Sequence, residues 1–406
     1  MKNPYFKTAL GIYISYCMLG MIVILLSTNM QFLTKQFNTD AAGISFLISI
    51  EGLARAATLY IAGRLSDKFG RKKFICIAPL IMIIFLVGTP LSPNYQVAVL
   101  VSVFAGIAHA FMDAGSYPSL LECFPKTPGT AAVLIKAFIA TGGVILPFII
   151  AFFVAKNMFY GYTFYLIAII MFLNSMFLFS RKFPKANETN DVKVTQNVKE
   201  LHDEKFVPKP IFKKEGIALI VIGFTSNAIF MGFQTWMPTY AQNVLGMSQI
   251  NSLKSITYYS IGAVISVLIL AKLLQKTIKP ILVLLVYPII GLTVLASILL
   301  IRTSTVTIIG FFLIGLSSAG VLQMAQATMG ELFSKNKGAT IALVSTASGV
   351  AAAVIPALTG LILRHYDILH VFYFMIIIFV IAISTSIFAF VRYYKVVRLS
   401  KQKYTI

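Results

Sequence analysis

The feature that most constrains this sequence is a succession of twelve apolar stretches. A helix needs roughly 20 mostly apolar residues to cross the hydrocarbon core of a bilayer. Six stretches precede a polar segment at 181–214, and six follow it. They cover residues 8–33, 43–66, 74–91, 95–122, 127–154, 160–180, 215–241, 252–274, 279–300, 305–332, 338–363 and 368–394. The sequence therefore predicts an all-α integral membrane protein with twelve transmembrane helices.

The composition supports a membrane protein and argues against other classes. Only 12% of the residues are charged and 58% are hydrophobic, whereas a soluble domain carries about 25% charged residues. The net charge of +21 does not indicate nucleic-acid binding, because the cations lie in the gaps between apolar stretches. Cys17, Cys76 and Cys123 show no metal-binding spacing. The chain also lacks a GxxxxGK[ST] nucleotide loop, so transport powered by ATP is not expected. We expect neither an enzyme nor a cofactor, and we expect a proton gradient to drive transport.

The Lys and Arg residues predict the orientation in the membrane. They concentrate in the loop at 63–73, in the polar segment at 181–214 and in a basic tail at 395–406. Cytoplasmic loops of membrane proteins carry an excess of Lys and Arg. We therefore expect both termini and the linker at 181–214 to be cytoplasmic. The prediction is a multi-pass, monomeric protein of a bacterial cytoplasmic membrane, with the lipid bilayer as its surroundings.

An internal repeat divides the chain into two units. When the sequence is shifted by 209 residues, the fourth and fifth stretches match the tenth and eleventh. The matched pairs are Gly106/Gly315, Ala110/Ala319, Glu122/Glu331, Phe124/Phe333, Lys126/Lys335, Gly129/Gly338, Leu134/Leu343 and Pro147/Pro356. We predict two pseudo-symmetric six-helix bundles, residues 1–180 and 215–394. Repeated bundles of this kind commonly hold a substrate between them near the middle of the membrane.

The loop after the second stretch carries a recognisable motif. It reads GRLSDKFGRKK over residues 63–73, and it resembles the G-x-L-x-D-R/K-x-G-R-R/K signature of the major facilitator superfamily. The matching positions are Gly63, Leu65, Asp67, Lys68, Gly70, Arg71 and Lys72. The resemblance implies two bundles that rock about a central cavity, with this loop bracing one conformation against the other bundle. It therefore marks Gly63, Asp67, Gly70 and Arg71 as conformational gate residues.

Two further acids are assigned to the gate. Glu122 and Glu331 end the fourth and tenth stretches at matched places, each just before a lysine-bearing turn. This arrangement resembles the cytoplasmic acid–base networks of the superfamily.

Ionisable residues inside the apolar stretches are candidates for a site, because burying them in hydrocarbon is costly. Those deep within a stretch all lie in the first half: Glu51, Arg55, His109, Asp113 and Lys136. Glu51 and Arg55 are four residues apart and share a helix face. Asp113 and Lys136 lie at similar depth on either side of a turn, so they could form a buried ion pair. One interpretation is a solute and proton site, in which Asp113 or Glu51 changes protonation while the bases hold an anion or tune the acid. The alternative is a pair of structural ion pairs.

The second half offers neutral polar groups for a solute. The candidates are Asn227, Gln234, Tyr258, Gln323 and Gln326. Amides and aromatic rings suit hydroxylated or carboxylated solutes, although such amides also join helices to one another. Trp236 lies near the outer end of its stretch, where it could anchor at the interface or touch a solute.

These features favour proton-coupled symport of a small polar solute, a sugar or an organic acid. The alternative is a drug/proton antiporter. Drug exporters of the superfamily carry G-x-x-x-G-P-x-x-G-G in the fifth helix, and here that region reads KAFIATGGVILPF, which lacks most of the motif. The run DAGSYPSLLE faintly resembles fucose-type sugar–proton symporters. A sensor or lipid-handling protein on the same fold is a third hypothesis, since fold alone does not determine function.

Overall fold

The computed structural model describes residues 4–124, 128–184, 210–273, 279–333 and 337–403. Within these ranges, twelve helical segments are long and apolar enough to cross a membrane, which confirms the predicted number. The helices of the first half are α1 (Phe6–Thr28), α2 (Met30–Gln36), α3 (Ala41–Phe69), α4 (Arg71–Leu91), α5 (Tyr95–Cys123), α6 (Pro128–Ala155) and α7 (Gly161–Phe179). Those of the second half are η1 (Phe212–Gly216), α8 (Ile217–Asn243), α9 (Gln249–Leu273), α10 (Pro280–Ile301), α11 (Ser304–Ser318), α12 (Val321–Leu332), α13 (Lys337–His365) and α14 (Ile368–Lys403).

Two of the expected single helices are divided. The first stretch forms α1 and the short α2, which meet at Asn29. The tenth forms α11 and α12, because the chain changes direction at Ala319 and Gly320. Gly320 has φ +88°, a conformation that glycine adopts without steric cost. Most of the predicted linker at 181–214 lies outside the described residues, and α14 continues to Lys403, so the tail predicted from residue 395 begins within a helix.

The glycines of the sequence repeat have matching roles in the two halves. A Cβ atom added to Gly106 of α5 would lie 2.3 Å from the carbonyl oxygen of Glu51 in α3. A Cβ atom on Gly315 of α11 would lie 2.0 Å from the carbonyl oxygen of Tyr259 in α9. Both positions therefore require glycine, and each lets two helices of its own bundle approach closely. The repeat seen in the sequence is thus also a repeat of helix packing.

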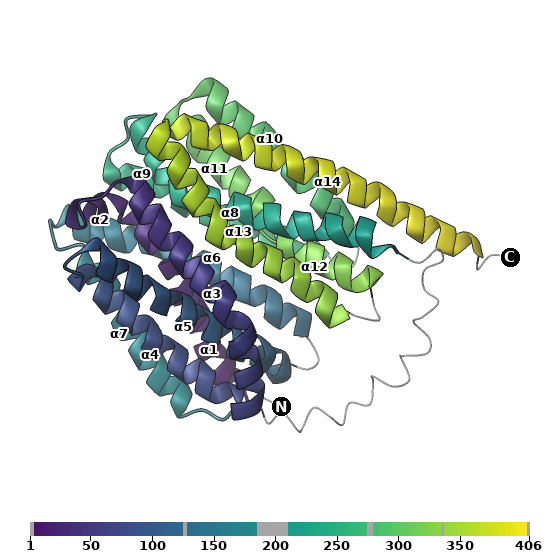
Figure 1. The fold of residues 1–406 in the computed structure, drawn as a ribbon, viewed down its shortest axis with the longest axis horizontal. Coiled ribbons are helices and arrows are strands. Elements are labelled where there is room, and N and C mark those ends of the chain that lie inside the picture. Colours follow the sequence, from purple (N-terminus) through teal and green to yellow (C-terminus); the bar gives the residue numbers. More distant parts are fainter. Residues whose placement is uncertain (1–3, 125–127, 185–209, 274–278, 334–336, 404–406) are drawn as a thin grey trace.

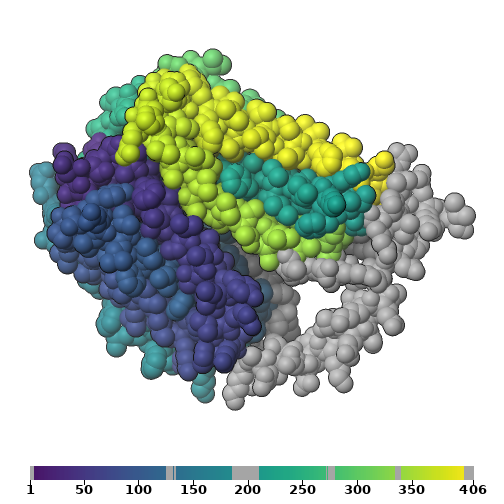
Figure 2. Space-filling model, in the orientation of Figure 1, coloured from purple at the N-terminus to yellow at the C-terminus, as the bar shows by residue number. Residues whose placement is uncertain are grey.

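The two halves meet along two pairs of helices, α3 with α13 and α6 with α9. In α3, a Cβ atom on Gly52 would lie 2.7 Å from the carbonyl oxygen of Ala352 in α13. Gly360, farther along α13, similarly lies against Ser45. Figure 1 shows α3 and α13 meeting toward the left and separating toward the right. In Figure 2, α3 (purple) lies directly against α13 (light green) on the face shown.

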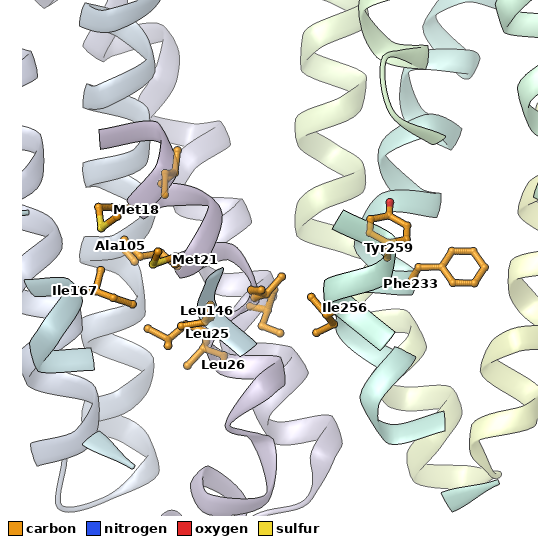
Figure 3. Packing of buried hydrophobic residues seen from close by; sticks show 14 of the residues in the cluster. Met18, Met21, Leu25, Leu26, Ala105, Leu146, Ile167, Phe233, Ile256 and Tyr259 are labelled. Atoms are coloured by element: carbon orange, nitrogen blue, oxygen red, sulfur yellow. The ribbon is translucent and has the colours of Figure 1, made fainter. Parts of the chain in front are cut away.

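Buried apolar side chains from both halves join into one cluster. Figure 3 shows Met21, Leu25 and Leu146 from the first half, and Phe233, Ile256 and Tyr259 from the second. Because lipid tails are as apolar as these side chains, close packing holds the helices together more than exclusion of water does. The cluster fixes the helices that surround the site described next.

Polar contacts between the halves gather at one end of the bundle. Arg364 donates to Asp40 at 2.7 and 2.8 Å, Gln31 bonds to Gln242, and Ser27 donates to the carbonyl oxygen of Gln234 at 3.2 Å. We call this the closed end. The other end, which carries the loop at 63–73 together with the start of α1 and the end of α14, we call the basic end.

Candidate functional site

A central cavity of about 100 Å³ lies between the halves. Residues of α1 and α6 line it on one side, and residues of α8, α9, α11 and α12 on the other. Among its polar lining residues are Lys136, Asn227, Gln234, Tyr259, Ser260 and Gln323. Among the described residues that line it, none is acidic. This volume holds several water-sized groups, which is room for a small solute.

The division between α11 and α12 lies on the cavity wall. Ser318, Ala319 and Gly320 all line the cavity, so α12 begins there with its first-turn N–H groups free of intrahelical partners. The Tyr259 hydroxyl lies 2.9 Å from Ser318 Oγ and holds the end of α11. The sequence did not predict this helix break on the cavity wall, although the run SSAG at 317–320 indicates a point where a long apolar helix could break.

Asp113 pairs with Arg55 and not with Lys136. Arg55 Nη2 donates to Asp113 Oδ2 at 2.6 Å, and its Nε donates to the same oxygen at 3.1 Å. The Tyr16 hydroxyl donates to the other carboxylate oxygen at 3.0 Å. The predicted Asp113–Lys136 ion pair is therefore wrong. The sequence placed Asp113 and Lys136 at similar depth in the membrane, which made a pair between them possible. In the structure, the guanidinium group of Arg55 on α3 occupies the position next to the Asp113 carboxylate.

Glu51 on α3 contacts His109 on the neighbouring helix α5. His109 Nδ1 lies 3.4 Å from Glu51 Oε1, and His109 Nε2 lies 3.9 Å from Asp113 Oδ2. Glu51 is only 8% exposed and His109 only 6%. Glu51 and Arg55 do share α3, as predicted, but their side chains have different partners. The structure thus joins four of the five predicted ionisable residues into one network of α3 and α5.

Lys136 is the fifth, and it stands apart from this network. It lines the cavity from α6. Within the described ranges, its ammonium group forms no hydrogen bond or ion pair. Asp113 and Arg55 are close enough to act on it electrostatically. Their mutual pairing leaves Lys136 without a close counter-charge.

The predicted amide and aromatic candidates divide into two groups. Gln234 and Gln323 line the cavity, as does Asn227, which also donates to the carbonyl oxygen of Ser348 at 2.6 Å. Gln326 instead donates to Ser345 Oγ at 2.8 Å. Tyr258 is 40% exposed, and its neighbour Tyr259 takes the place on the cavity wall. Whether these residues bind a solute stays a prediction.

Trp236 has neither of the two expected positions. It is 0% exposed, and its Nε1 donates to Thr359 Oγ1 at 2.7 Å. The indole therefore joins α8 to α13 inside the second half. The position near the helix end suggested an interfacial anchor, but helix packing buries the ring.

The residues assigned to the gate form local networks at the basic end. Arg71 pairs with Glu122 and lies 3.8 Å from Asp67. Gly70 has φ +92° and makes the turn between α3 and α4, whereas a Cβ atom on Gly63 would meet nothing within 4 Å. The bracing of one bundle by the other, which the family resemblance implies, is not seen in these contacts.

The second half has a related network with different chemistry. Tyr393 donates to Glu331 at 3.0 Å, and Arg392 Nη2 lies 2.6 Å from Glu215 Oε1. Glu331 matches Glu122 in the repeat, but a tyrosine on α14 replaces the arginine as its partner. At the basic end, therefore, these acids are held within their own halves.

Twelve membrane-crossing segments in two repeated bundles, closed at one end around a cavity that carries a few polar groups, define a membrane transporter. The sequence matches the model of the Major Facilitator Superfamily over residues 12–327 and 286–403. The chain belongs to this superfamily, so the fold and family expected from the loop motif are confirmed. It is a transporter and not an enzyme.

Relatives of the chain carry the names of transporters. It is 44% identical over 395 residues to the uncharacterized MFS-type transporter YfkL of Bacillus subtilis (strain 168), covering 97% of this chain and 98% of that protein. It is 35% identical over 396 residues to the inner membrane transport protein YdiN of Escherichia coli (strain K12), covering 97% and 92%. The predicted multi-pass location in a bacterial cytoplasmic membrane is thereby confirmed.

Solved structures share the fold. The crystal structure of a D-xylose-proton symporter superposes with a TM-score of 0.74 at 15% identity, covering 95% of this chain and 97% of that one. A bacterial homologue of the human lysosomal transporter Spinster gives a TM-score of 0.72 at 13% identity, covering 97% of each chain. At these identities the likeness concerns the fold alone.

Proposed function

We propose that this protein is a proton-coupled symporter that moves a small polar solute, a sugar or an organic acid, by alternating access. The contact between Glu51 and His109 carries the proposal. Glu51 is a buried carboxylate whose side chain has a titratable histidine as its contact at 3.4 Å. Asp113, by contrast, accepts hydrogen bonds from Arg55 and Tyr16. The acid with the weaker partner is the better proton carrier.

The position of Glu51 suits coupling to a conformational change. The next residue, Gly52, lies against Ala352 of the other half, so Glu51 is beside the surface along which the halves would move. The charged and titratable groups around the pair are Arg55 on α3 and Asp113 on α5. Protonation of Glu51 would remove a buried negative charge and thereby favour the conformation in which α3 packs against α13, whereas the ionised form would favour exposure of this position to water.

The solute would occupy the central cavity. Its amides offer hydrogen-bond partners, and its apolar walls exclude water. With the basic end cytoplasmic, as the Lys and Arg distribution predicts, the cavity is closed toward the outside by Asp40 and Arg364. The symporter fold of the D-xylose-proton symporter is compatible with this mode.

The test compares wild type and Glu51→Gln in proteoliposomes. We expect Glu51→Gln to abolish accumulation driven by a pH gradient while leaving exchange of labelled for unlabelled solute intact. Asp113→Asn serves as the comparison, since it is also a buried acid of the same network. Full pH-driven accumulation by Glu51→Gln would refute coupling through this residue.

A drug/proton antiporter is the second candidate. The supporting observation is 25% identity over 276 residues to the multidrug resistance protein 2 of Bacillus subtilis (strain 168), covering 66% of this chain and 65% of that one. A substrate assay in cells under a proton gradient separates the two modes. Efflux of cationic dyes would favour the antiporter, and uptake of a sugar or organic acid would favour the symporter.

A further inference from the structure

Lys136 is a cation in a cavity for which the described part of the chain supplies no acidic lining residue. It lines the cavity from α6, and Asn227, Gln234 and Gln323 line it from the second half. Lys136 is partly exposed to this cavity, and an ammonium group without a counter-ion inside a membrane-spanning bundle is costly. In other transport proteins such groups pair with each other or mark the path of a charged solute. Here the nearest acid, Asp113, is already bonded to Arg55.

The start of α12 adds a second positive element to the same wall. Gly320 begins this helix and lines the cavity. A helix N-terminus carries free N–H groups and the positive end of the helix dipole, and both favour an anion. In transporters with divided helices, such ends face anionic groups of substrates.

The packing along α9 places these two elements at one depth. Gly143 of α6 lies against Ser260 of α9. Because the two helices are antiparallel, Lys136, seven residues before Gly143, lies level with Val267, seven residues after Ser260. The break between α11 and α12 contacts α9 close to Val267. Ser266 Oγ donates to the carbonyl oxygen of Ala319 at 3.4 Å, and Gly320 lies against Leu270.

Two buried polar side chains lack partners on the walls of this cavity. Gln234 is 7% exposed, and among the described residues no hydrogen bond from its amide is found. Ser260 is 1% exposed, and its hydroxyl also has no partner there. Buried polar groups are normally hydrogen-bonded. Their unused bonding capacity is an observation, independent of the helix end, that indicates a ligand.

We infer that the solute is a small monocarboxylate whose carboxylate lies between Lys136 and the N-terminus of α12. One unpaired cation matches one negative charge. The body of the solute extends toward the closed end, where Gln234 lies next to Ser27, and contacts the ring of Phe230 and the amides on the wall. The inference rests on the proposed function, because it names the solute class of that same site.

The test measures binding by thermal stabilisation of the purified full-length protein. Each monocarboxylate probe is set beside an uncharged counterpart: gluconate beside sorbitol, benzoate beside benzyl alcohol, and lactate beside propane-1,2-diol. We expect stabilisation by a carboxylate and none by its counterpart. Stabilisation by the uncharged members alone would overturn the inference and leave symport of a neutral solute standing.

Variants then test the role of Lys136 with the best carboxylate probe. We expect Lys136→Met to weaken binding by roughly 10- to 100-fold, the range for losing a hydrogen bond to a charged group, and Lys136→Arg to retain most of the affinity. Lys156→Met is the matched control, because Lys156 is exposed on the turn after α6. Unchanged carboxylate binding by Lys136→Met would overturn the inference.

The same preparations separate the two proposals. If carboxylate binding depends on Lys136 but a pH gradient drives no accumulation in proteoliposomes, the anion site stands and proton symport fails. If accumulation follows the pH gradient for a neutral sugar in both wild type and Lys136→Met, symport stands and the anion site fails.

Discussion

Arg364 and Asp40 join the two halves of the protein through paired hydrogen bonds, from Nε to Oδ2 at 2.7 Å and from Nη2 to Oδ1 at 2.8 Å. Asp40 also caps α3 by accepting from the Gly43 amide at 2.8 Å. One carboxylate therefore both starts a helix of the first half and holds the end of α13 in the second. This pair is a direct polar link across the closed end.

Asp40→Asn should loosen the closed end. The pair is exposed to solvent, so its contribution is small, and we expect a roughly two- to fivefold faster maleimide labelling of a cysteine introduced at Thr239, which lines the space at that end. The matched control is Asp367→Asn, whose carboxylate accepts from the His370 backbone amide at 3.1 Å, next to and within the first turn of α14. Equal labelling of Asp40→Asn and wild type would show that the pair does not hold this end.

The same pair predicts how the closed end responds to pH. The hydrogen bond from Arg364 holds the pKa of Asp40 below its usual value. A carboxylate with a lowered pKa stabilises the folded contact above its ordinary pKa, and it loses this contribution as the pH falls through the lowered value. The thiolate fraction of a cysteine at position 239 rises with pH in every background, so the measured quantity is the ratio of its labelling rate in Asp40→Asn to that in the wild-type background. We expect this ratio to be constant between about pH 6 and pH 8, and a systematic change within that range would contradict the assignment.

Removing one partner of the Asp113–Arg55 pair should destabilise the protein. Asp113→Asn leaves the partly buried charge of Arg55 without its counter-ion, at a cost of about 1–3 kcal/mol. The double variant Asp113→Asn/Arg55→Gln should recover much of that stability, since no charge is left unpaired. Thermal unfolding in detergent measures both. Equal stability of Asp113→Asn and wild type would show that the pair is not structural.

Two glycines should respond oppositely to replacement by alanine. Gly315→Ala should destabilise the protein by about 1–3 kcal/mol, because its Cβ atom would lie 2.0 Å from Tyr259 O. Gly63→Ala should leave the melting temperature unchanged or slightly raised, because its Cβ atom meets nothing within 4 Å and alanine favours a helix. If Gly63→Ala is stable but does not transport, glycine is required at this position in a conformation other than the one described here.

Trp236 should behave as a buried fluorophore. The chain contains one tryptophan, so its emission can be assigned without ambiguity. Because the indole is 0% exposed and bonded to Thr359, we expect blue-shifted emission and weak quenching by acrylamide. Strong quenching by acrylamide or by lipid-borne quenchers would place the ring at the interface instead.

The transmembrane architecture could be predicted from the sequence because its causes are local. Hydrocarbon thickness sets the length of each apolar stretch, so the twelve spans are visible without tertiary information. The repeat was visible because glycines such as Gly106 and Gly315 are each required by close helix contact. The motif at 63–73 identified the superfamily because it is a short, contiguous run.

Side-chain partners depended on tertiary structure. Sequence spacing gave the depth of Asp113 and Lys136 but not the rotation of α3, which brings Arg55 to Asp113 and leaves Lys136 facing the cavity. The break at Gly320 and the burial of Trp236 likewise arise from packing between helices. The sequence by itself determined that the chain is a two-part membrane carrier with ionisable groups in one half. Only the tertiary structure decided which charges neutralise each other and which one remains for a solute, because pairing requires distances of a few ångströms between helices far apart in the chain.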